Sequence, residues 1–137
     1  MARRLRPFRF AVFAEGVRSR EALLDTARRA EDGGFATILI RDHFIAEPFG
    51  HQLAPLAALA TVAAVTRRLR IGSLVFANDY RHPVVLAKEA ATLDVLSGGR
   101  FELGLGAGSR GQSTSKPGLR LIRRTFARSA WRRPSTS

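Results

Sequence analysis

Residues 81–108 read RHPVVLAKEAATLDVLSGGRFELGLGAG, and this stretch decides the fold. His82-Pro83 opens a helix, because proline fixes the backbone angle that the first helical turn needs. Apolar residues follow at helical spacing until Ser97-Gly98-Gly99 closes the helix: Leu86, Ala90 and Leu93. Apolar residues then alternate with small or polar ones, as in a strand: Phe101, Leu103 and Leu105. The stretch therefore predicts one helix followed by one strand, which ends at Gly106.

The same succession of strand and helix occurs twice upstream. Residues 8–14 and 35–40 are short, apolar and rich in β-branched or aromatic side chains, which predicts two buried strands. Between them, Ser19 is placed to cap a helix that ends at Gly33-Gly34. Pro55 begins a second helix, and residues 69–77 give a further strand. The apolar stripe of this second helix comprises Leu56, Leu59, Ala60, Ala63 and Ala64.

Strands that are separated by single amphipathic helices form right-handed crossovers and a parallel sheet. The sequence therefore predicts an α/β fold with about four parallel strands and three helices over residues 8–108, after a disordered lead-in over residues 1–7. A complete (β/α)8 TIM barrel has roughly 250 residues, whereas this chain has 137. We therefore expect a truncated (β/α)8 TIM barrel. We also expect two copies to pair as a homodimer through the open barrel edges.

Residues 109–137 interrupt this pattern. They carry 8 of the 23 lysines and arginines and none of the 11 acidic residues, so they hold +8 of the net charge of +12. Ser, Arg, Gly and Pro dominate, which predicts a disordered basic tail. Two interpretations stay open: a basic arm that binds nucleic acid, and an unevolved segment of the kind that a shift of reading frame gives. We favour the second.

The composition excludes several classes of protein. The chain has no cysteine, which rules out disulfide scaffolds, thiolate zinc sites and cysteine nucleophiles and fits a reducing compartment. Arginines interrupt every apolar run, so no segment approaches the roughly 20 residues that a membrane span needs. We therefore expect a cytoplasmic protein with no membrane partner.

Candidate site residues follow the predicted strands. In parallel α/β folds, ligands bind at the carboxyl ends of the strands. Polar residues and glycines gather at those positions: Glu15-Gly16, Asp42-His43, residues 78–81 and residues 106–108. Any one of them alone is more often a turn residue, but the grouping predicts a site for a small molecule.

Four motifs make this inference more specific. They are Gly33-Gly34-Phe35 leading into residues 38–43, Arg81-His82-Pro83, residues 88–94 (KEAATLD) and residues 97–108 (SGGRFELGLGAG). Together they resemble the amino-terminal half of the luciferase-like monooxygenase superfamily. They are most similar to its branch that uses the deazaflavin coenzyme F420. The resemblance covers residues 8–108.

The resemblance implies an oxidoreductase or monooxygenase that moves a hydride between coenzyme F420, or alternatively FMN, and an organic small-molecule substrate. It implies that Asp42 and His43 are catalytic, with His43 a proton donor or acceptor. It also implies a non-prolyl cis peptide at Leu74-Val75 or Val75-Phe76. The implied cofactor-binding residues are Leu74, Val75, Phe76, Asn78, Gly106 and Gly108. We expect truncation to impair or abolish the activity.

Two other motifs are weaker. Residues 106–111 match G-x-G-x-x-G, but no helix-forming segment follows and the tail has no acidic residue, as a dinucleotide site would need. His43, Glu47 and His51 could ligate a metal only on a helix that Pro48 and Gly50 would break. We therefore predict no metal site.

Nucleic-acid binding is the alternative function. It would rest on tail arginines and fall steeply with salt: Arg123, Arg124, Arg128, Arg132 and Arg133. Only Phe126 and Trp131 accompany them as aromatic side chains, so recognition beyond electrostatics is not expected.

Overall fold

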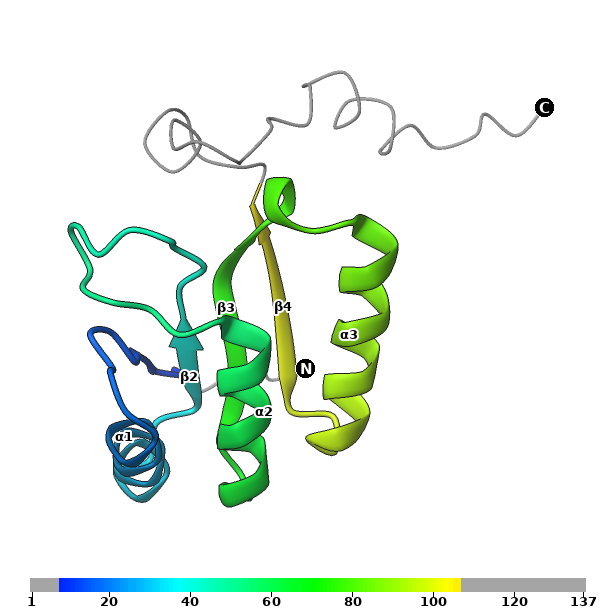
Figure 1. Cartoon of the computed structure of the whole chain (residues 1–137). Coiled ribbons are helices and arrows are strands. Elements are labelled where there is room, and N and C mark those ends of the chain that lie inside the picture. The colour runs from blue at the N-terminus through cyan, green and yellow to red at the C-terminus, as the bar shows by residue number, and fades with distance from the viewer. Residues whose placement is uncertain (1–7, 107–137) are drawn as a thin grey trace, which may run out of the picture.

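The computed structural model describes residues 8–106, which form a four-stranded parallel sheet and three α-helices (Figure 1). The strands lie side by side in chain order, β1-β2-β3-β4. Sequential, all-parallel strands with single intervening helices are the arrangement of the first half of a (β/α)8 barrel, which confirms the predicted fold class. The elements are β1 Ala11–Phe13, α1 Arg20–Asp32, β2 Thr37–Ile40, α2 Pro55–Val65, β3 Arg70–Ala77, the 3-10 helix η1 Asn78–Tyr80, α3 Pro83–Leu96 and β4 Phe101–Gly106.

The helices begin where the capping residues predict. The Oγ of Ser19 accepts a hydrogen bond from the backbone N–H of Ala22, 3.1 Å away, at the start of α1. Pro55 and Pro83 occupy the first turns of α2 and α3. The Nδ1 of His82 accepts from the backbone N–H of Val84 at 3.3 Å, which confirms that His82 serves the start of α3.

The core lies between the helices and one face of the sheet. Ile38, Ile71 and Phe101 are register partners on β2, β3 and β4, and all three are buried in one cluster with residues of the helices. Those helical residues include Leu23, Ala27, Leu59, Val62, Leu86 and Leu93. All three helices therefore cover the same face, as right-handed crossovers require.

The opposite face, here called the inner face, carries Thr37, Arg70 and Glu102. The Nε of Arg70 donates to Glu102 Oε1, and the hydroxyl of Thr37 lies 3.4 Å from Glu102 Oε2. Because side chains alternate along a strand, Leu39 and Gly72 also belong to this face. In a (β/α)8 barrel this face lines the interior.

Two charged side chains close the amino ends of the strands. Glu31 of α1 accepts hydrogen bonds from the backbone N–H groups of residues 67–69, at 2.6 to 3.2 Å. Burial works in the opposite direction, but these backbone donors hold the pKa of Glu31 below its usual value. Arg100 donates to the carbonyls of Ala63, Leu69 and Ser97 and to the hydroxyl of Thr66, at 2.7 to 3.0 Å. Together they fix the connections around α2, β3 and β4.

Two predictions about the elements were wrong in part. The first strand covers only Ala11–Phe13, and Phe8 and Phe10 are exposed, because β1 has a neighbour on one side only within residues 8–106. The strand after α1 begins at Thr37, because the N–H of Phe35 bonds the carbonyl of Ala30 and belongs to the helix end.

The buried face of α2 also differs from the predicted stripe. Ala60 and Ala64 are exposed, whereas Ala58 and Val62 are buried. All residues of this helix except Thr61 are apolar, so periodicity alone could not select the face. Among residues 8–106, no helix is long and apolar enough to cross a membrane.

Candidate functional site

The loop between β2 and α2 and the 3-10 helix η1 lie at the carboxyl ends of the strands, at the same end of the sheet (Figure 1). Predicted site residues from β1, β2 and β3 meet there. The structure thus gathers the groups that the sequence placed after separate strands.

Asp42 forms an ion pair with Arg81 at this edge. We call it the closed pair, because both carboxylate oxygens and both terminal nitrogens of the arginine are bound. Its side chain is 4% exposed, and its Oδ2 accepts from the backbone N–H of Ala77 at 3.0 Å. Both terminal nitrogens of Arg81 donate to the two carboxylate oxygens, Nη2 to Oδ1 at 3.0 Å. This hydrogen bonding with Asp42 outweighs burial and raises the pKa of Arg81. Asp42 therefore ties the end of β2 to the end of β3.

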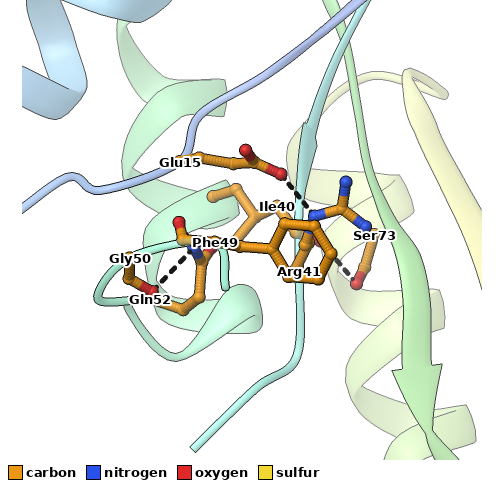
Figure 2. A network of polar contacts seen from close by, with 7 residues as sticks. All are labelled: Glu15, Ile40, Arg41, Phe49, Gly50, Gln52 and Ser73. Carbon is orange, nitrogen blue, oxygen red and sulfur yellow. Dashed lines mark hydrogen bonds and ion pairs between the residues drawn. The ribbon is translucent and has the colours of Figure 1, made fainter. Parts of the chain in front are cut away.

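Arg41, the residue before Asp42, forms an ion pair with Glu15. We call it the open pair, because it has a single contact. Its Nε donates to Glu15 Oε1, and the two side chains are 22% and 34% exposed. The guanidinium carbon lies 4.2 Å from the ring centre of Phe13 and 3.9 Å from that of Phe49. Figure 2 shows the Phe49 ring against the guanidinium and Glu15 at its edge. Two cation–π contacts thus fix the guanidinium.

The loop after β2 holds Phe49 in place. The Nε2 of Gln52 donates to the carbonyls of Phe49 and Gly50, at 3.0 and 3.2 Å (Figure 2). Gly50 has a φ of 76°, and a Cβ there would lie 3.0 Å from the Cα of Gly16. The loop therefore packs directly on the backbone after β1, in a conformation that favours glycine.

His43 follows Asp42 and is half-buried. Its ring meets the Phe49 ring edge-on, with the ring centres 5.5 Å apart. Phe49 therefore contacts both His43 and Arg41, and the three side chains form one cluster. In residues 8–106, no group of three His, Asp or Glu side chains is placed to hold a metal ion.

The predicted cis peptide is present. The bond between Leu74 and Val75 is cis, within the stretch where the β3–β4 register shifts, between Ser73 and Phe76. Leu74 is 51% exposed. Val75 lies against β4, because a Cβ at Gly104 would be 3.3 Å from Val75 Cγ1 and one at Gly106 2.5 Å from its Cγ2.

Other predicted cofactor-binding residues fall in different places. Phe76 is fully buried in the core against Phe101, so its side chain is not available to a ligand at this edge. Asn78 begins η1 directly after β3 and is half-buried. Gly106 ends β4, and Gly108 lies outside the described residues.

Arg41 was not among the predicted site residues, and Arg81 was predicted only within residues 78–81, without its partner Asp42. A signal for Arg81 was present, because a carboxylate next to a buried strand needs a cationic partner, and Arg81 follows the neighbouring strand. Arg41 gave no such signal, since its aromatic neighbours come from β1 and from an irregular loop.

The sequence that builds this site matches a known family. The family model described as luciferase-like monooxygenase matches residues 8–129. The chain belongs to the luciferase-like monooxygenase family. The match extends beyond Gly108, the last residue of the resemblance set out above.

The relatives of this luciferase-like chain include a monooxygenase and a dehydrogenase. It is 40% identical to the 4-hydroxyprotoasukamycin monooxygenase of Streptomyces nodosus subsp. asukaensis, over 63% of this chain and 23% of that protein. It is 38% identical to the F420-dependent glucose-6-phosphate dehydrogenase of Amycolatopsis mediterranei, over 63% of this chain and 27% of that protein. The chain thus spans about a quarter of the length of these relatives.

A solved structure gives the same result for the fold. The coenzyme F420-dependent tetrahydromethanopterin reductase of Methanopyrus kandleri superposes with a TM-score of 0.65 and 27% identity. The superposition covers 74% of this chain and 28% of the reductase.

Proposed function

We propose that this chain binds coenzyme F420, with FMN as the alternative, at the carboxyl ends of its strands and takes part in hydride transfer to or from an organic substrate. The names of the relatives support F420, because the glucose-6-phosphate dehydrogenase and the tetrahydromethanopterin reductase are both F420-dependent. Family membership supports the reaction class.

The exposed apolar surface at the end of β3 carries this proposal. Leu74 is 51% exposed, and the side chain of Val75 covers two glycines of β4, so this part of the surface is apolar and low. An apolar surface without tall neighbours suits the face of a planar ring system. The residues present therefore fit a flavin or deazaflavin ring.

The polar groups around this surface have separate tasks in the proposal. The bound coenzyme would supply or accept the hydride. His43 would give or take the accompanying proton, because an imidazole can donate or accept a proton and this ring lies at the same edge. Asp42 would act as a positioning residue, since its oxygens are already bound by Arg81 and Ala77.

Binding of the coenzymes tests the proposal directly. The chain is titrated with F420 and with FMN, and the change in coenzyme fluorescence gives each dissociation constant. We expect Leu74→Asp to weaken the binding about tenfold or more, because it places a charge against the ring face. Val84→Asp is the matched control, since Val84 is an exposed valine on α3.

Two results would overturn the proposal. One is that the parent chain binds neither coenzyme at millimolar concentration. The other is that Leu74→Asp and Val84→Asp both bind the coenzyme with the same dissociation constant as the parent.

A further inference from the structure

The open ion pair leaves most of the donors of Arg41 unused. A guanidinium has five N–H donors, and within residues 8–106 only the Nε of Arg41 has an acceptor, Glu15. The side chain is 22% exposed, so solvent reaches the unused edge. Arg81 differs, because both of its terminal nitrogens are taken up by Asp42.

Arg41 also stands on the side of the sheet where ligands bind. Thr37 and Leu39 belong to the inner face, and by alternation Arg41 follows them. Phe13 pairs with Leu39 in register and lies on the same face. The guanidinium therefore stands at the carboxyl end of the inner face, between two aromatic rings.

A guanidinium held in this way is prepared to bind an oxyanion. The two rings fix its plane, so little side-chain freedom is lost when a ligand binds. Its unused terminal N–H groups match the two oxygens of a carboxylate or phosphate. The Arg81 guanidinium, by contrast, has both terminal nitrogens bound to Asp42.

We propose that Arg41 is the recognition residue for an anionic group, a carboxylate or a phosphate, of a molecule bound in this site. The anion binds the terminal nitrogens while Glu15 keeps the Nε. The nearby carboxylate of Glu15 lowers the anion affinity and sets it in a weak, reversible range. This inference deepens the proposed function and rests on it for the nature of the bound molecule.

The anion has two sources, which are the coenzyme and the substrate. FMN and riboflavin separate them, because these molecules differ only by a phosphate. If Arg41→Lys weakens the binding of FMN and leaves riboflavin unchanged, the coenzyme supplies the anion. If both bind as in the parent and added phosphate still shifts the Arg41 resonance in the presence of FMN, the substrate supplies it.

Inorganic phosphate is the probe for the anion site itself. The 15N-labelled chain is titrated with phosphate at constant ionic strength, and the arginine Nε–Hε resonances are followed by NMR. The resonance that Arg41→Lys removes identifies Arg41. We expect this resonance to shift with saturation, and that of Arg81 to stay in place.

Two variants sharpen the titration. Glu15→Gln removes the competing charge, so we expect phosphate to bind several-fold more tightly. Arg41→Gln should weaken phosphate binding about tenfold, the value of a hydrogen bond to a charged group. Arg29→Gln removes a matched positive charge from an exposed pair on α1 and should leave the affinity unchanged.

The proposal is overturned if the Arg41 resonance does not saturate, or if Arg29→Gln weakens phosphate binding as much as Arg41→Gln does. Failure of the proposed function gives a different result. In that case neither coenzyme binds the parent, while the phosphate titration of Arg41 still reads out the anion site.

Discussion

Arg41 and Asp42 are adjacent at the end of β2, yet their ion pairs are built in opposite ways. In the Asp42–Arg81 pair the carboxylate is buried, both terminal nitrogens of the arginine have contacts, and a backbone N–H also donates to the carboxylate. The Glu15–Arg41 pair has a single contact, is partly exposed and is bordered by aromatic rings. The two residues are neighbours in the chain. Both carboxylate oxygens of Asp42 accept hydrogen bonds, whereas the terminal nitrogens of Arg41 have no acceptor within residues 8–106.

We infer from this difference that the two ion pairs at this edge of the sheet have separate roles, one in stability and one in the proposed binding. A buried ion pair is costly to break, because the remaining partner is left as an unpaired charge. An exposed pair contributes little to stability, so its arginine can exchange partners at small cost. We therefore expect the closed pair to hold the strand ends and the open pair to meet the ligand.

Removing the carboxylate of the closed pair should have the largest effect. Asp42→Asn leaves Arg81 without its counter-charge, and we expect a loss of about 3 kcal/mol in the free energy of unfolding. Urea denaturation measures it. Glu15→Gln is the matched change in the open pair and should cost less than about 1 kcal/mol. Equal losses in the two variants would contradict the comparison.

Removing one ring from the open pair should have a smaller effect. Phe49→Ala deletes one cation–π contact of Arg41 and its contact with His43, for a loss of about 1 kcal/mol. We also expect phosphate to bind Arg41 several-fold more weakly, because the guanidinium is no longer held. Phe44→Ala, which removes an exposed ring that contacts Tyr80, is the control. Phosphate affinity that Phe49→Ala leaves intact would speak against pre-organisation by the rings.

The carboxylate of Glu31 differs from both pairs, because its partners are backbone N–H groups. We expect it to make the free energy of unfolding depend on pH in the acid range. Its pKa is lowered on folding, so its stabilisation is present at neutral pH. That stabilisation is lost as the pH falls below the ordinary glutamate value of about 4.3 and through the lower folded value. In Glu31→Gln, the free energy of unfolding should change with pH by about 1 kcal/mol less over this range, a value that allows for the partial exposure of Glu31. Urea denaturation between pH 3 and pH 7 measures the change. An unaltered curve would exclude Glu31 as its source.

Salt should produce the smallest effect. At 1 M salt the Debye length is about 3 Å, so the coupling energy of Glu15 with Arg41 should fall by a few tenths of a kcal/mol. The coupling of Asp42 with Arg81 should change less, because the Asp42 carboxylate is buried. Double-mutant cycles at low and high salt measure both couplings. The reverse order of salt sensitivity would show that burial does not distinguish the pairs.

Local signals made most of the fold predictable from the sequence. Ser19, Pro55 and His82-Pro83 mark helix starts by chemistry that acts within one turn, and the structure has all three. The resemblance located the cis peptide to two bonds, one of which is cis. The buried face of α2 could not be predicted, because that helix is apolar nearly all round.

The candidate site was less predictable, because its contacts join distant segments. Arg41 meets Glu15 across 26 residues, and Asp42 meets Arg81 across 39. Strand-end position indicated which segments would meet, but not which side chains would pair. Phe49 was missed for the same reason, since it lies in a loop without periodicity.

Arg100 has a consequence for the folding pathway. Its hydrogen bonds to Ala63, Thr66 and Leu69 join residues 31 to 37 positions apart, so they form only when α2, β3 and the start of β4 have come together. Contacts of this kind close late, because chain entropy opposes them until the helix between is in place. Loss of Arg100 should then act chiefly on the unfolding rate and leave the folding rate little changed. The side chain that joins these connections in the folded state is thus expected to form its contacts in the last step of folding.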